Sequence, residues 1–219
     1  MATVIYIVRH GESEGNRQER FLGHTDLPLT DRGRRQAALA GAYLKEKKIS
    51  FDRVFASPLC RAYETAEIIA GAVGYNAPPS PLPDMMEIAA GKWENREYAA
   101  LMRKFPHSYG ELWRHHIGLA AADGGETVRS LAERAMRAVF SVAAENEGKT
   151  VLIGTHATPL RAVETYARGL PVAEMERVPF APNASLSAYC VEAGGTVQSI
   201  FYAFCDYLGA EATFFPSTV

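Results

Sequence analysis

Three short segments of the chain are rich in β-branched and aromatic residues and lack regular polar alternation. They are Thr3–Val8 (TVIYIV), Arg53–Ala56 (RVFA) and Thr150–Gly154 (TVLIG). Runs of this length and composition are typical of strands, and the first and third have the continuous apolar pattern of strands buried on both faces. The sequence therefore predicts a sheet whose central strands are covered on both sides.

Between and after these strands, apolar residues recur at helical spacing in four stretches. The first begins at Thr30-Asp31 and runs to about Lys48, with Thr30 as the N-cap. The second starts at Ser57-Pro58, a pair typical of an N-cap followed by the first helical position, and ends near Gly74. The third covers Glu126–Asn146, and the fourth follows His156 with Leu160, Val163 and Ala167 on one face.

The remaining segments complete an α/β pattern. Residues 9–29 are predicted to form an ordered loop, and residues 76–84, with four prolines, a loop with room for one edge strand. Residues 185–191 and 196–204 predict a closing hairpin. Alternating strands and helices predict a three-layer α/β/α sandwich with a mostly parallel central sheet. We expect a single domain over residues 1–219, with an insertion of short helices at about 93–123.

Composition narrows the class of protein. The 219 residues carry a net charge of −2, so the chain lacks the basic field that nucleic-acid binding needs. No apolar run reaches the ~18 residues of a membrane span. The three cysteines, Cys60, Cys190 and Cys205, show no CxxC spacing and predict reduced thiols in a cytoplasmic protein. The N-terminus lacks the basic and small-residue features of a signal peptide.

Polar residues follow the carboxyl ends of the three predicted strands, where α/β sheets bind ligands. These segments are Arg9-His10-Gly11, Ser57–Arg61 and Gly154-Thr155-His156. Arginine forks match a tetrahedral phosphoryl group, Asn16 adds a donor, and imidazole is a competent nucleophile. Each of these side chains taken singly has a structural explanation, but together they favour a phosphoryl-transfer site.

These segments, RHGESEGN, SPLCRAYETA and the late histidine, resemble the histidine phosphatase superfamily, which includes the cofactor-dependent phosphoglycerate mutases. The similarity extends from Thr3 to about Asp206, and the motifs follow the order of the family. It implies a phosphoglycerate mutase-like fold and a reaction that uses no metal or cofactor. The substrate it implies is a small phosphorylated metabolite.

The resemblance implies a role for each matching residue. His10 matches the nucleophilic histidine, and Glu87 in MMEIAAGKWEN matches the general acid. Arg9, Arg61 and His156 complete the implied catalytic set. The implied substrate-binding residues are Arg9, Gly11, Asn16, Leu22, Gly23, Arg61 and His156. Glu126 in GGETV matches a further signature, for which helix N-terminal charge is as good an explanation as catalysis.

Some positions depart from the family pattern. Leu22 stands where many members carry a polar side chain, and Ala157 and Thr158 follow the late histidine, where small residues are usual. The acid segment and the short insertion differ from those of the mutases. The sequence therefore favours a phosphatase, with a mutase as the first alternative and a catalytically idle phosphate-binding module as the second.

The insertion and the tail leave substrate choice and assembly open. The aromatic residues of the insertion either roof the site or form the insertion's own small core, and the core is favoured; they are Trp93, Tyr98, Phe105, Tyr109 and Trp113. Candidates for binding a second anionic group are Arg17, Arg20 and Arg114. Phe214-Phe215 either contacts a second subunit in a homodimer or folds back on the chain.

Overall fold

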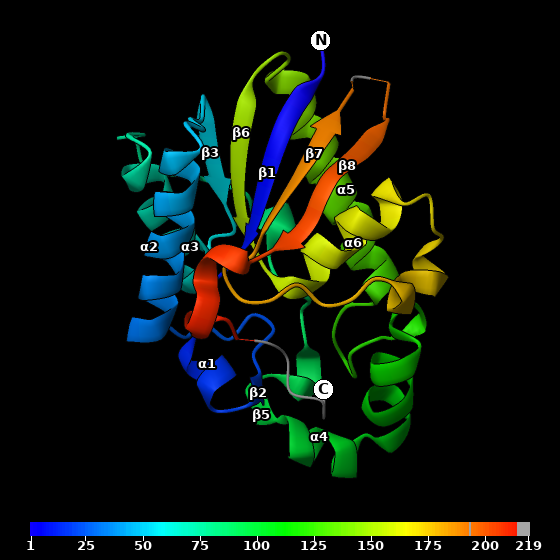
Figure 1. Cartoon of the computed structure of the whole chain (residues 1–219). Helices are drawn as coiled ribbons and strands as arrows, with labels where there is room; N and C mark the ends of the chain where they lie inside the picture. Colours follow the sequence, from blue (N-terminus) through cyan, green and yellow to red (C-terminus); the bar gives the residue numbers. More distant parts are fainter. Residues whose placement is uncertain (193, 214–219) are drawn as a thin grey trace.

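The computed structural model describes residues 1–192 and 194–213, and a six-stranded sheet runs through its centre (Figure 1). In spatial order the strands are β4 (Ser80–Pro81), β3 (Arg53–Ala56), β6 (Thr150–Thr155), β1 (Thr3–Arg9), β7 (Leu186–Val191) and β8 (Val197–Phe204). The first four pair in parallel, whereas β7 and β8 pair antiparallel. The predicted mostly parallel sheet and closing hairpin are confirmed.

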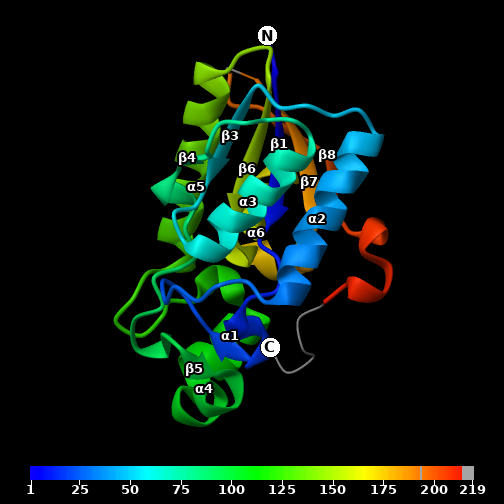
Figure 2. The ribbon, with the colours of Figure 1, turned by 90° about the vertical axis from the view of Figure 1, so that its left-hand side faces the viewer.

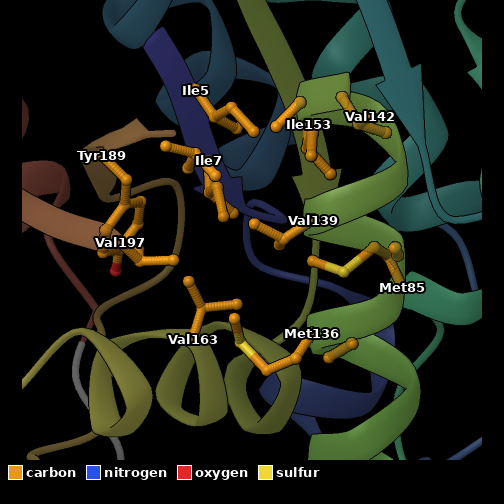
Figure 3. Close-up of a cluster of buried hydrophobic side chains, with 14 of the residues drawn as sticks. Ile5, Ile7, Met85, Met136, Val139, Val142, Ile153, Val163, Tyr189 and Val197 are labelled. Atoms are coloured by element: carbon orange, nitrogen blue, oxygen red, sulfur yellow. The ribbon is translucent and has the colours of Figure 1, made fainter. Parts of the chain in front are cut away.

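Helices cover both faces of the sheet. In Figure 2, α2 (Asp31–Glu46) and α3 (Cys60–Ala72) lie in front of it, and α5 (Val128–Glu145) and α6 (Ala157–Ala167) lie on the opposite face. Successive strand residues point to opposite faces. Ile5 and Ile7 therefore pack toward α5 and α6 (Figure 3), while Val8 joins the cluster under α2 and α3. Both faces of the central strands are buried, and the predicted α/β/α sandwich is confirmed.

Two predicted helix starts have different outcomes. Thr30 is the N-cap of α2, and its Oγ1 accepts a hydrogen bond from the Gly33 amide at 3.0 Å. The start predicted at Ser57-Pro58 is wrong, because α3 begins at Cys60 and has Leu59 as an N-cap without a side-chain bond. Ser57 instead extends the sheet, since its amide donates to Gly154 O, and its hydroxyl contacts His156.

The segment predicted as a loop after β1 contains two short elements. They are α1 (Glu14–Arg17) and β2 (Arg20–Phe21), which pairs antiparallel with β5 (Arg96–Glu97). Ser13 and Asn16 form a reciprocal capping box at the start of α1. The pairing of β2 with β5 holds this segment against the insertion, which lies below the sheet in Figure 1.

Residues 93–123 form mostly short helices, and their buried aromatic side chains pack in a cluster, the insertion's core, that also includes residues of α5 and α6. The elements are η2 (Gly91–Trp93), α4 (Tyr98–Lys104), the π-helix η3 (Pro106–Trp113) and η4 (Ile117–Leu119). Trp93 and Tyr109 are fully buried in this cluster, together with Phe21. The other 3-10 helices are η1 (Pro83–Met85), η5 (Val172–Arg177) and η6 (Asp206–Glu211).

Three further predictions concern cysteines, membranes and the tail. All three cysteines are free thiols. Within residues 1–192 and 194–213, no helix combines the length and the apolar character needed to cross a membrane. Phe214 and Phe215 lie outside the described residues.

Candidate active site

The carboxyl end of the sheet faces the insertion (Figure 1). A pocket lies here, lined by residues from both parts. Its lining combines charged groups with apolar side chains. The lining residues are Arg9, His10, Asn16, Arg20, Phe21, Leu22, Gly23, Arg61, Glu87, Tyr98, Trp113, Ala157, Thr158 and Phe180. Seven of the nine site residues that the resemblance implies, Leu22 among them, line this pocket.

His10 is fixed by its backbone and by one ring nitrogen. Its amide donates to Thr155 O at 2.9 Å, and its carbonyl accepts from the Ala184 amide and from Asn183 Nδ2. Nδ1 lies 2.7 Å from Gly11 O. Because a carbonyl oxygen only accepts, Nδ1 carries the proton, and the lone pair is on Nε2. The geometry thus presents Nε2 as the reactive nitrogen.

His156 lies beside His10, with ring centroids 5.2 Å apart. Its Nε2 is 2.7 Å from Ser57 Oγ. Among the described residues, its buried Nδ1 has no hydrogen-bond partner. Ser57 Oγ accepts from the Leu59 amide, so its hydroxyl can donate to Nε2 and leave the proton on Nδ1. Nδ1–H is then a donor suited to a phosphoryl oxygen.

The two arginines are almost fully buried. Arg9 Nη1 donates to Ala181 O at 2.6 Å, and Arg61 donates to the carbonyls of Thr25 and Gly23 at 2.9 and 2.8 Å. Burial lowers the pKa of Arg9 to about 10, so the guanidinium stays charged at neutral pH. Burial also lowers the pKa of Arg61. Two buried cations beside His10 create the local positive potential that an otherwise acidic chain needs to bind phosphate.

The loop that Arg61 holds depends on Glu94. This carboxylate accepts hydrogen bonds from the amides of His24, Thr25 and Ala90 and from the Thr25 hydroxyl. Gly23 has a φ of +54°, and a Cβ there would lie 2.3 Å from Glu94 Oε1. Only glycine fits this position without displacing Glu94.

Asn16 and Glu87 also line the pocket. Asn16 Oδ1 accepts hydrogen bonds from the Ser13 amide, the Ser13 hydroxyl and Asn183 Nδ2, which leaves the Nδ2 hydrogens of Asn16 available for an anion. Glu87 Oε1 accepts from the Ile88 amide at 3.0 Å, and Oε2 lies 3.4 Å from the Thr158 amide. Asn16 thus offers a donor, and Glu87 offers a carboxyl group to a bound ester.

Other predicted residues lie in different places. Gly11 and His156 are outside the pocket lining, although Gly11 orients His10 and His156 contacts it. Arg20 lines the pocket, but Arg17 and Arg114 do not. The substrate contacts predicted for these residues therefore stay predictions.

Several residues that support the site carried no signal in the sequence. Asn183 bridges His10 O and Asn16 Oδ1. Phe180 lines the pocket from the segment before β7. These contacts join residues distant in sequence, so no local motif indicates them.

The two buried histidines predict acid sensitivity. Burial, then Arg61, lowers the pKa of both His10 and His156 well below 6.5. As pH falls through 6.5, the unfolded chain binds protons that the folded chain does not, so stability falls. We expect His10→Gln to lose less thermal stability than the wild type between pH 7.5 and 5.5. Melting curves across this range test this, and a pH-independent difference in Tm between the two proteins contradicts it.

Comparisons with known proteins show which family this chain belongs to. Residues 5–201 match the histidine phosphatase superfamily (branch 1). A probable phosphoglycerate mutase GpmB of Serratia proteamaculans is 34% identical over 187 residues, covering 84% of this chain and 82% of that protein. The structure of Bacillus stearothermophilus YhfR superposes with a TM-score of 0.86 and 30% identity, covering 94% of this chain and 100% of that one. A putative alpha-ribazole-5'-P phosphatase from Escherichia coli superposes with a TM-score of 0.78 and 26% identity, covering 91% and 95%.

Proposed function

The chain belongs to the histidine phosphatase superfamily, and we propose that it is a phosphatase that hydrolyses small phosphate monoesters through a phosphohistidine on His10. This makes it a phosphoric monoester hydrolase that needs neither metal nor cofactor. The proposal is supported by His10, whose Nδ1 contact with Gly11 O leaves a lone pair on Nε2, in a pocket that it lines together with two buried arginines.

In the first half of the proposed reaction, the Nε2 lone pair of His10 attacks phosphorus. The bond between phosphorus and the ester oxygen breaks, and the leaving oxygen takes a proton from Glu87. Arg9, Arg61 and Nδ1–H of His156 stabilise the charge on the equatorial phosphoryl oxygens. The alcohol leaves, and the phosphoryl group stays on Nε2.

In the second half, a water molecule attacks the phosphohistidine. Glu87, now a carboxylate, takes a proton from that water. The bond between phosphorus and Nε2 breaks, and its electron pair returns to His10. Inorganic phosphate is released, which restores the starting protonation of His10 and Glu87.

The outer wall of the pocket supports a phosphatase over a mutase. Apart from the groups near His10, this wall is mostly apolar, and its residues include Phe21, Leu22, Trp113, Ala157 and Phe180. The additional cation in the lining is Arg20, which already donates to Asn95 O at 2.7 Å and lies 3.6 Å from Glu97. A mutase must bind a second anionic group, and this wall provides little positive charge for one.

A phosphoglycerate mutase is the second candidate, since relatives of this chain are named as such. To separate the two, EDTA-treated protein is incubated with a panel of phosphate monoesters. The panel includes 3-phosphoglycerate with a trace of 2,3-bisphosphoglycerate. Free phosphate without 2-phosphoglycerate supports the phosphatase. Rapid formation of 2-phosphoglycerate supports the mutase, and neither product supports an idle binding module.

Arg20 provides a test of how the outer wall selects substrates. Among the described residues, Arg20 is the one cation of this wall that a second anionic group could meet, so Arg20→Gln is expected to raise KM about tenfold for esters that carry such a group and still bind, a change equivalent to about 1.4 kcal/mol. KM for p-nitrophenyl phosphate, which lacks that group, should stay within about twofold. Steady-state kinetics on both ester classes test this, and an unchanged KM for the dianionic esters contradicts it.

A further inference from the structure

The segment that carries Glu87 is held by one side chain of the neighbouring helix. Arg134, on α5, donates to the carbonyls of Asp84, Met86 and Glu87 at 2.8, 2.7 and 3.0 Å. It also forms a two-pronged pair with Glu126, at 2.8 and 2.9 Å. These bonds use all five N–H donors that a guanidinium possesses. The side chain is therefore fully committed to this contact.

Arg134 supplies hydrogen bonds to backbone carbonyls that a helix or strand would otherwise satisfy. After η1 the chain runs through residues 86–90 outside any helix or strand. A carbonyl without a partner in a partly buried loop costs about 1–3 kcal/mol. Arg134 donates to three such carbonyls at once, and among side chains only the planar guanidinium group of arginine has enough donors to do so while also pairing with Glu126. The arginine thereby fixes the path of the backbone at Glu87.

Glu126 keeps the charge of this contact balanced. Burial alone raises the pKa of its carboxyl group, but the hydrogen bonds from Arg134 lower it below its ordinary value overall. Its Oε2 also lies 3.3 Å from the Ala89 amide, and its own amide donates to Ala89 O. Glu126 thus extends the contact to Ala89, at the other end of the segment from the carbonyls that Arg134 holds.

The backbone carbonyl of Glu87, which Arg134 contacts from α5, is also contacted by His24 from the loop that Arg61 holds. His24 Nε2 lies 2.8 Å from Glu87 O. The neighbouring Gly23 and Thr25 carbonyls accept from Arg61. The backbone of Glu87 is therefore fixed between α5 and the loop that holds Arg61. Loss of the α5 anchor leaves the Glu87 carbonyl held, among the described residues, by His24 alone, so Glu87 can shift relative to His10 while Arg61 keeps its own contacts.

We propose that the Glu126–Arg134 pair positions Glu87 for proton transfer to the leaving group. The proposal rests on the proposed function of Glu87 and gives Glu126 a role other than direct catalysis. Neither Arg134 nor Glu126 lines the pocket. Their loss should weaken proton delivery and leave phosphate binding intact.

The test compares esters that differ in their need for a proton. We expect Arg134→Met to lower kcat/KM for an alkyl phosphate about 30-fold or more, and for p-nitrophenyl phosphate less than about threefold. Arg134→Lys keeps the charge but not the fork, so it should show the same selectivity with a smaller loss. Arg137→Met is the matched control, because Arg137 lies on the same helix and is exposed. It should behave as the wild type.

A double-mutant cycle separates positioning from general destabilisation. In a Glu87→Gln background there is no acid to position, so adding Arg134→Met should change kcat/KM for the alkyl ester less than about threefold. Equal losses for both esters, or a full additional loss in that background, overturn the proposal. If Arg134→Met does not fold, Arg134→Lys carries the same comparison. A wild type that releases phosphate from neither ester refutes the proposed function instead.

Discussion

Replacing His10 with alanine is expected to abolish phosphate release, lowering kcat by about four to six orders of magnitude. The reason is that, in the proposed reaction, His10 Nε2 is the nucleophile of the first half-reaction and carries the phosphoryl group into the second, and its Nδ1 contact with Gly11 O leaves the lone pair on Nε2. His156, the neighbouring imidazole, has its Nε2 at Ser57 and, in our assignment, a proton on Nδ1. It is therefore a donor and does not replace His10.

The measurement is acid-labile labelling with a ³²P-phosphate ester, followed by rapid quenching. The wild type should acquire label that acid removes and base retains, and His10→Ala should acquire none. Alanine at His115, an exposed histidine of the insertion, is the control and should leave labelling unchanged. Label that persists in His10→Ala would place the nucleophile on another residue.

The architecture could be predicted because its signals are local. Ile5, Ile7 and Val8 form part of one uninterrupted apolar run, and the structure buries them on alternate faces under two different helix pairs. Thr30 caps α2 through the next turn of its own chain. Propensity and periodicity decide such contacts within a few residues, so the sequence alone indicates them.

The support of the site could not be predicted, because it depends on backbone carbonyls far along the chain. Arg134 contacts carbonyls about fifty residues earlier, and any residue type supplies a carbonyl. Asn183 reaches His10 across 173 positions. Ser57 misled the prediction for a related reason: its preference for helix N-caps was outweighed by the ladder bond to Gly154 and by the contact with His156.

The aromatic residues of the insertion are predicted either to roof the site or to form the insertion's own core, and the structure shows that the two are compatible. Trp93 and Tyr109 are fully buried and belong to the insertion's core. Tyr98 and Trp113 belong to the same core and also line the pocket. A small aromatic core therefore supplies the apolar wall, so the packing that stabilises the insertion also shapes the space for the leaving group.

Replacing Glu87 with glutamine is expected to slow esters according to their leaving group. An alkoxide needs a proton as it departs, so kcat/KM for an alkyl phosphate should fall about 10²–10⁴-fold. p-Nitrophenolate leaves without a proton, so kcat/KM for its ester should fall less than about tenfold. kcat/KM is the right quantity here, because it reports only steps up to transfer of the phosphoryl group to His10.

Hydrolysis of the phosphohistidine provides an independent test of Glu87 as the group that transfers protons. If Glu87 is also the base for water, Glu87→Gln should accumulate phosphohistidine and release p-nitrophenolate in a burst of about one equivalent per site. Glutamine at Glu133, an exposed carboxylate on α5, is the control and should leave both measurements unchanged. Equal slowing of the two esters without a burst would mean that Glu87 maintains the shape of the pocket and that another group, or solvent, supplies the proton. A burst together with the leaving-group effect requires one group that gives and then takes a proton, and Glu87 is the carboxylate that lines the pocket beside His10.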